Sequence, residues 1–183
     1  MTNEIKIAGF GGQGVLSMGM TLAYAGVFEG KQVVWMPSYG PEMRGGTANC
    51  TVIISNDRIS SPIINQFDMA IILNQPSLDK FENTVKPMGQ IFYESNNVIN
   101  PPTREDVSVF EVPAALEAVN LKNAKGMNMI MLGAFLEKNP IVSIDSILKA
   151  LKKVLPERHH HLISANEKAL KRGMELLQNP VLS

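Results

Sequence analysis

The hydrophobic positions of this chain form short continuous apolar runs that alternate with segments of helical periodicity. Residues 4–8 (EIKIA) and 32–36 (QVVWM) are short runs with little alternation between apolar and polar positions. Such runs are typical of parallel strands that are covered on both faces. Between them, the segment from Val15 to Glu29 is rich in Leu, Met and Ala and ends at Gly30, a residue typical of a helix C-terminus. The pattern predicts a strand, a helix and a second strand.

The rest of the chain continues this alternation. Residues 47–55 (TANCTVIIS) predict a further strand, and residues 56–61 predict a turn followed by a returning antiparallel strand over 58–61. Further strands are expected at 67–73, 90–93 and 107–112, and further helices from Pro76 to about Val85 and over 114–119, 127–137, 144–155 and 161–177. The expected fold is α/β, with one domain over residues 1–183: a single doubly wound, mostly parallel sheet with helices on both faces and an antiparallel hairpin.

A glycine-rich turn joins the first predicted strand to the first predicted helix. Gly9, Gly11 and Gly14 satisfy the pattern Gly-x-Gly-x-x-Gly, in which the missing side chains let the backbone approach a pyrophosphate closely. The N–H groups at the start of the helix would then face the anion. The alternative is a turn that only packs the helix on its strand. Gln13 would donate its amide to a phosphate or a carbonyl, or would cap the helix.

The turn is not accompanied by the acid that a nicotinamide site requires. In such sites an Asp or Glu about 20 residues further on binds a ribose hydroxyl. Here the strand at 32–36 is followed by residues 37–40 (PSYG), and the nearest acid, Glu42, lies inside the next loop. The sequence therefore argues against an independent NAD enzyme.

The loop over residues 39–47 (YGPEMRGGT) lies where the second strand of an open sheet would end, and ligands bind at such carboxyl ends. Arg44 beside two glycines could form a charge-assisted clamp on a phosphate, and Tyr39 offers a ring to a flat group. Alternatively, Glu42 and Arg44 pair on a solvated loop that contacts a partner protein. These residues support ligand contact and partner contact equally.

Composition excludes several classes of protein. The 183 residues are 45% hydrophobic, which suffices for one substantial core. With 17 Lys and Arg against 17 Asp and Glu, the chain has no overall field for nucleic acid or an anionic membrane. Its one cysteine, Cys50, excludes an internal disulfide and is expected to be buried and inert. No apolar run approaches the ~20 residues that span a bilayer, and no signal peptide is recognised, so a cytoplasmic location is expected.

The other residues that could bind a metal or react are better explained by structural roles. Three consecutive histidines at 159–161 would point in different directions on a helix, so a solvated helix start is expected instead of a metal site. Met127, Met129 and Met131 are expected to fill a core, with an interface stripe as the alternative. The sequence has no Gly-x-Ser-x-Gly elbow, Walker lysine or cluster of His and carboxylates. It therefore predicts no catalytic residue and no metal site, which is typical of a subunit.

Two motifs together indicate a family. Residues 10–14 (FGGQG) and 38–49 (SYGPEMRGGTAN) closely resemble the gamma subunit of the 2-oxoacid:ferredoxin oxidoreductases, particularly of the 2-oxoglutarate type. Residues 67–68 (FD) and 74–76 (NQP) fit the same pattern, and the resemblance covers most of the chain. It implies an enzyme complex that oxidatively decarboxylates a 2-oxoacid on thiamine diphosphate, passes electrons through iron–sulfur clusters to ferredoxin, and forms an acyl-coenzyme A.

The resemblance implies that this chain contributes coenzyme A binding and assembly, while thiamine diphosphate and the iron–sulfur clusters lie on other subunits. The residues that would face coenzyme A are Gly9, Gly11, Gly12, Gln13, Gly14, Tyr39 and Arg44. The implied partners are thiamine-binding alpha and beta subunits and a ferredoxin-like delta subunit, without which the isolated chain is expected to be inactive. Its many methionines and an apolar pair of predicted helices favour a homodimer when partners are absent. The alternative is a purely structural assembly module of an indolepyruvate or ketoisovalerate oxidoreductase.

Overall fold

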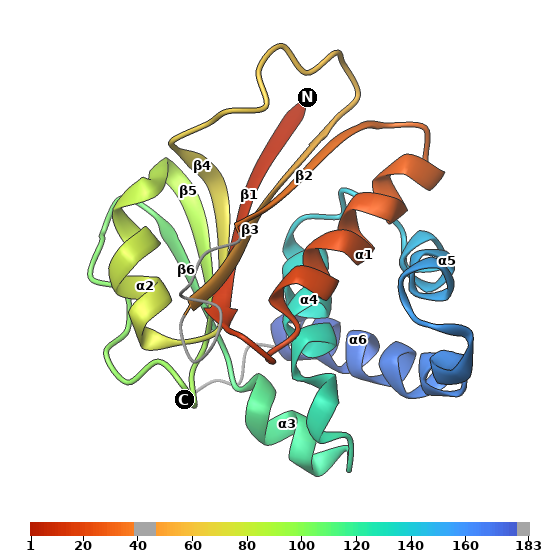
Figure 1. Cartoon of the computed structure of the whole chain (residues 1–183). Helices are drawn as coiled ribbons and strands as arrows, with labels where there is room; N and C mark the ends of the chain where they lie inside the picture. Colours follow the sequence, from red (N-terminus) through yellow and green to blue (C-terminus); the bar gives the residue numbers. More distant parts are fainter. Residues whose placement is uncertain (39–46, 179–183) are drawn as a thin grey trace.

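A six-stranded sheet forms the centre of the protein in the computed structural model, which describes residues 1–38 and 47–178 (Figure 1). The strands are Thr2–Phe10 (β1), Gln32–Ser38 (β2), Thr47–Ser55 (β3), Phe67–Ile72 (β4), Val85–Glu94 (β5) and Ser108–Val112 (β6). They lie in the order β2-β3-β1-β4-β5-β6. Strand β3 runs antiparallel to both of its neighbours, whereas β1, β4, β5 and β6 pair in parallel. The expected mostly parallel sheet is confirmed.

Helices cover both faces of this sheet. The helices are Val15–Phe28 (α1), Gln75–Phe81 (α2), Ala114–Asn120 (α3), Met127–Lys138 (α4), Ile144–Val154 (α5) and Ile163–Gln178 (α6). Helices α1 and α4 pack on one face, with α5 and α6 outside them, whereas α2 covers the other face (Figure 1). The doubly wound arrangement expected from the sequence is therefore confirmed.

Strand β1 is buried on both sides, as its continuous apolar pattern predicts. Ile5 and Ile7 are fully buried in the core between the sheet and α1 and α4. Ala8 belongs to the smaller core between the sheet and α2. Because both faces of β1 are covered, its carboxyl end is fixed firmly at the edge of the sheet where the glycine turn begins.

The antiparallel element differs from the predicted hairpin. Residues 58–61 form no strand, and β3 instead pairs along its whole length with β1, from Thr2 opposite Ser55 to Phe10 opposite Thr47. Strand β3 also pairs with β2, so both of its edges are occupied. Of residues 58–61, only Ile59 is partly buried, so this segment has too little apolar surface to add a strand.

The boundary between α2 and β5 also differs from the prediction. The helix ends at Phe81, a short 3₁₀ turn follows, and β5 begins at Val85, five residues earlier than expected. Val85 pairs with Phe67 of β4. The Lys86 ammonium in this extension donates to Glu4 on β1 and to Asp68 on β4, the latter at 2.8 Å. These charged contacts join β5 to β4 and to β1 beyond it, and an apolar pattern cannot reveal them.

The predicted burial of Cys50 and of Met129 and Met131 is confirmed. Cys50 is fully buried, and burial raises the pKa of its thiol to about 12, so the thiol is protonated and unreactive at neutral pH. Met129 and Met131 are buried in the larger core. The histidines at 159–161 lie in a 3₁₀ turn, and the described residues contain no group of three or more side chains suited to a metal ion. None of the helices in the described part has the length and apolarity for a membrane span.

Candidate functional site

The winding of the sheet reverses between β1 and β4. Helix α1 follows β1 and lies on one face, whereas α2 follows β4 and lies on the other (Figure 1). In open α/β sheets, ligands bind outside the carboxyl ends of the strands at such a reversal. The glycine turn leaves β1 at this edge, and the N–H of Leu73 donates to the carbonyl of Ala8 at 2.9 Å, so the chain leaves β4 beside it.

The glycines of the turn have different structural roles. Gly12 and Gly14 adopt left-handed conformations, with φ of 91° and 79°. A Cβ atom at Gly9 would lie 2.8 Å from Leu73 Cβ, and one at Gly14 would lie 2.4 Å from Asn128 Nδ2, so both glycines permit close packing. At Gly12 a Cβ would meet nothing within 4 Å. The turn therefore packs closely against its neighbours at two glycines and leaves open space at the third.

Gln13 stabilises the turn from within. Its Oε1 accepts a hydrogen bond from the N–H of Phe10 at 2.6 Å, and its Nε2 donates to the carbonyl of Leu73 at 3.3 Å. The sequence left three roles open for this amide: a hydrogen bond to a phosphate, a hydrogen bond to a carbonyl, or a helix cap. The structure shows the hydrogen bond to a carbonyl. Gln13 thereby connects the turn after β1 to the end of β4 and holds the backbone of the turn in place.

Helix α1 begins with backbone N–H groups that have no acceptor within the helix. Its N-cap is Gly14, which has no side chain to accept a hydrogen bond, and the first turn of the helix contains no acidic residue. The N–H of Met18 donates to the carbonyl of Gly14 at 2.9 Å, so the N–H groups of residues 15–17 precede this bond and lack an intrahelical acceptor. These donors and the positive end of the helix dipole favour an anion at this position.

A cavity of about 490 Å³ opens at this helix start. One wall consists of the glycine-rich turn and the first helical turn of α1. The second wall consists of a 3₁₀ turn, Ala124–Gly126 (η3), and the start of α4. The lining residues are Gly12, Gln13, Gly14, Ser17, Ala124, Lys125, Met127 and Asn128. The cavity is within the size range of ligand sites.

Of the other residues predicted to face coenzyme A, the structure describes Gly9 and Gly11. Gly9 is buried and Gly11 is exposed, and neither lines the cavity. Tyr39 and Arg44 lie outside the described residues. The structure therefore brings Gly12, Gln13 and Gly14 together at one cavity.

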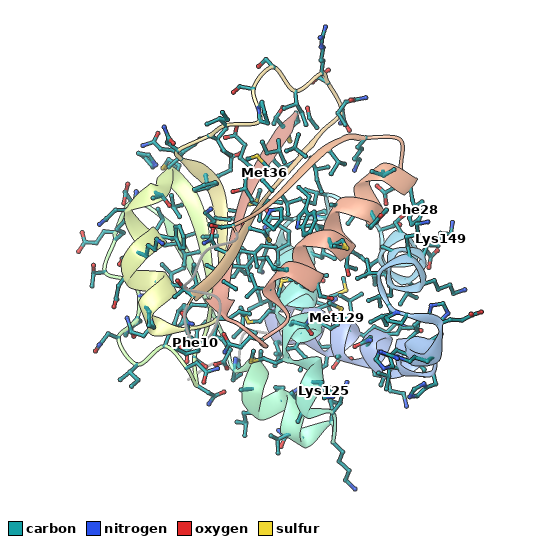
Figure 2. All side chains as sticks on the ribbon, viewed as in Figure 1. Phe10, Phe28, Met36, Lys125, Met129 and Lys149 are labelled. Carbon is teal, nitrogen blue, oxygen red and sulfur yellow. The ribbon has the colours of Figure 1, made fainter. Side chains whose placement is uncertain are left out.

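Sequence reasoning missed the second wall of the cavity. Asn128 Nδ2 donates to the carbonyl of Gly14 at 3.4 Å, although the two residues are 114 positions apart. Lys125 lies close by, at the junction that leads into α4 (Figure 2). Residues 124–128 (AKGMN) match no phosphate-binding motif, so no signal in the sequence identified them. Their place at the site follows from the packing of α4 against the sheet.

A second polar group is buried on the opposite face of the sheet. The ammonium of Lys6 donates to Asn49 Oδ1 at 3.0 Å and to Thr51 Oγ1 at 3.2 Å, and burial lowers its pKa. Nearby at the start of α2, Asn74 Nδ2 and Ser77 Oγ are buried without a hydrogen-bond partner in the described part of the chain. These groups do not line the cavity at α1.

Sequence comparison gives one family. A family model described as pyruvate ferredoxin/flavodoxin oxidoreductase matches residues 4–176. The ketoisovalerate oxidoreductase subunit VorA of Methanothermobacter thermautotrophicus is 40% identical over 94% of this chain and 36% of its own length. The 2-oxoglutarate synthase subunit KorC of Methanocaldococcus jannaschii is 32% identical over 86% of each chain. This chain therefore spans about a third of VorA and most of KorC.

Solved structures give the same fold. The gamma subunit of a keto/oxoacid ferredoxin oxidoreductase from Geobacter sulfurreducens is 30% identical, with a TM-score of 0.79 over 94% of this chain and 96% of that chain. A 2-oxoglutarate:ferredoxin oxidoreductase from Magnetococcus marinus, solved with 2-oxoglutarate, coenzyme A and succinyl-CoA, has a TM-score of 0.86 at 24% identity. The match covers 97% of this chain and 31% of that chain. At this identity the likeness is one of fold.

Proposed function

Because the chain belongs to the pyruvate ferredoxin/flavodoxin oxidoreductase family, we propose that it is the gamma subunit of a 2-oxoacid:ferredoxin oxidoreductase and supplies the coenzyme A site of that complex. The complex oxidatively decarboxylates a 2-oxoacid and joins the resulting acyl group to coenzyme A. In this proposal the chain binds and orients coenzyme A, and the bonds of the 2-oxoacid are broken on partner subunits.

The cavity at the start of α1 carries this proposal. The N–H groups without an intrahelical acceptor, the positive helix end and the open space at Gly12 suit a diphosphate. Gln13 keeps the backbone of the turn in one conformation through its two hydrogen bonds, so little ordering is needed on binding. The missing acid after β2 distinguishes the site from one for a nicotinamide ribose, and the diphosphate of coenzyme A has no such requirement.

The remaining chemistry is assigned to partners. The chain has one cysteine, which is buried and protonated, and so it cannot supply the set of thiolates that holds an iron–sulfur cluster. We propose that thiamine diphosphate lies on alpha and beta subunits and that the clusters lie there or on a ferredoxin-like delta subunit. We further propose the cytoplasm as the location of the complex.

Two 2-oxoacids are candidate substrates. The relative with the higher identity is a ketoisovalerate oxidoreductase subunit, and the relative of matching length is a 2-oxoglutarate synthase subunit. Since the cavity described here suits a phosphate group, the pocket for the acid is assigned to a partner subunit. The motifs of this chain are compatible with both acids.

Purification of the chain with its native partners tests the proposed function. We expect it to co-elute with thiamine-binding subunits and the complex to reduce ferredoxin with ketoisovalerate or 2-oxoglutarate in a coenzyme A-dependent reaction. The isolated chain should show no turnover, because it contains none of the groups that break bonds. Activity of the isolated chain, or a complex that functions without coenzyme A, would contradict the proposal.

A purely structural assembly role is the second candidate, and an exposed apolar surface favours it. Val27 and Phe28 at the end of α1 are 53% and 49% exposed, and Figure 2 labels Phe28 at this end of the helix. A mainly apolar hollow of about 230 Å³ lies between α1 and the edge strand β2, lined by Met20, Ala23, Tyr24, Val27, Val33 and Trp35. Exposed apolar surface of this kind is typical of protein contacts. In this alternative the complex would bind coenzyme A on another subunit, and changes at Gly12 would leave its affinity unaltered.

A further inference from the structure

Resting on the proposed function, we propose that Lys125 binds the diphosphate of coenzyme A from the second wall of the cavity. Lys125 would thereby make the site selective for the phosphorylated ligand over its pantetheine part. The comparisons with known proteins assign no role to this residue, and its position in the sequence does not suggest one.

The position of Lys125 at the cavity supports this assignment. Lys125 lines the same cavity as Gly12 and Gly14, which lie in the turn before α1. The two walls are joined where Asn128 Nδ2 donates to the carbonyl of Gly14, and Lys125 lies three residues before Asn128. An anion at the start of α1 would therefore have backbone donors on one side and an ammonium group on the other.

The charges around the cavity also support a contact between Lys125 and the diphosphate. The start of α1 carries the equivalent of about half a positive elementary charge. The negative charge of a diphosphate is larger in magnitude than this. Among the described residues that line the cavity, Lys125 is the one charged residue and none is acidic. Its side chain forms no ion pair with any residue in the described part of the chain. No carboxylate of the described residues therefore competes with a phosphate for charge-assisted hydrogen bonds from this ammonium.

The backbone around Lys125 is held in place while its side chain stays exposed. Gly126 is buried, and a Cβ atom there would lie 3.3 Å from Ala169 Cβ on α6. The N–H of Gly126 also donates to the carbonyl of Asn123 at 2.8 Å. This anchoring fixes the place from which the long Lys125 side chain reaches into the cavity.

The test uses the assembled complex and three variants. Lys125→Met removes the charge, Lys125→Arg keeps it, and Lys122→Met is the matched control, because Lys122 is exposed and does not line the cavity. The measured quantities are the KM for coenzyme A, the KM for 3′-dephospho-coenzyme A, and the inhibition constant of pantetheine against coenzyme A.

We expect Lys125→Met to raise both KM values by about tenfold, the size of one charge-assisted hydrogen bond. Because both nucleotides keep the diphosphate, the two factors should be equal, and pantetheine inhibition and kcat should be unchanged. Lys125→Arg should restore most of the affinity, and Lys122→Met should match the unaltered complex.

Three outcomes would overturn the assignment. An increase for coenzyme A but not for 3′-dephospho-coenzyme A would place Lys125 at the 3′-phosphate. Equal losses for pantetheine and coenzyme A would indicate a structural effect. An unchanged KM in Lys125→Met, in a complex whose KM still responds to an acid at Gly12, would refute the role of Lys125 and leave the proposed function standing.

Discussion

Replacing Gly12 with Asp should raise the KM of the complex for coenzyme A about 30- to 100-fold above the KM of the Gly12→Asn variant. Asp and Asn have nearly the same shape, and both tolerate the left-handed backbone better than other side chains do. Gly12 has φ of 91° with open space where a Cβ would lie, so both variants bear a similar backbone cost. They differ mainly by one negative charge in the cavity.

The magnitude follows from the repulsion between that charge and the diphosphate. Two like charges about 4 Å apart repel by about 4 kcal/mol at an effective dielectric of about 20, and solvent screening reduces this to about 2–3 kcal/mol. Pantetheine carries no phosphate, so its inhibition constant should be the same in both variants and serves as the internal control. Equal KM values for coenzyme A in the two variants would favour the assembly role, in which the turn only packs α1 on the sheet.

Replacing Gly133 with Ala should lower the free energy of unfolding of the chain by about 2–3 kcal/mol, although alanine is the better helix former by about 1 kcal/mol. A Cβ atom at Gly133 on α4 would lie 1.9 Å from the carbonyl oxygen of Leu170 on α6. A Cβ at Gly173 would lie 1.9 Å from the carbonyl oxygen of Ile130. Because backbone atoms cannot rotate away, the two helices would have to separate.

Thermal or urea unfolding measures this effect, with a fall in Tm of about 5–10 °C expected for a chain of this length. Gly26→Ala is the matched control, because the three atoms nearest to a Cβ there all belong to side chains, the closest being the Val33 Cγ2 methyl at 2.9 Å. We expect that variant to change stability by less than about 1 kcal/mol. Combining Gly133→Ala with Gly173→Ala should cost less than the sum, since both act on one helix crossing. A Gly133 variant as stable as the Gly26 variant would contradict this packing.

Much of the fold could be predicted because its signals are local. Continuous apolar runs identified β1 and β4 as buried strands, and the glycine at position 30 marked the end of α1. The pairing of β3 could not be read in the same way, because strand pairing depends on contacts between distant segments. The apolar run at 47–55 predicts a strand without specifying its partners, and β3 pairs with β1 and β2 instead of with residues 58–61.

The candidate site could also be predicted only where its signal is local. The Gly-x-Gly-x-x-Gly pattern located the turn, and the structure places Gly12 and Gly14 at a cavity, as a ligand site requires. The pattern could not separate the roles of the glycines, because the packing at Gly9 depends on Leu73 and that at Gly14 on Asn128. The second wall, including Lys125, reaches the turn only through the packing of α4, so its contribution required the fold.

The central claim is that the start of α1 holds the diphosphate of coenzyme A, and a structure of the assembled complex with coenzyme A bound tests it most directly. The account predicts phosphate oxygens within hydrogen-bond distance of the backbone N–H groups of residues 15–17, in the cavity that Gly12 and Lys125 line. Coenzyme A bound elsewhere in the complex, with this cavity empty, would contradict it.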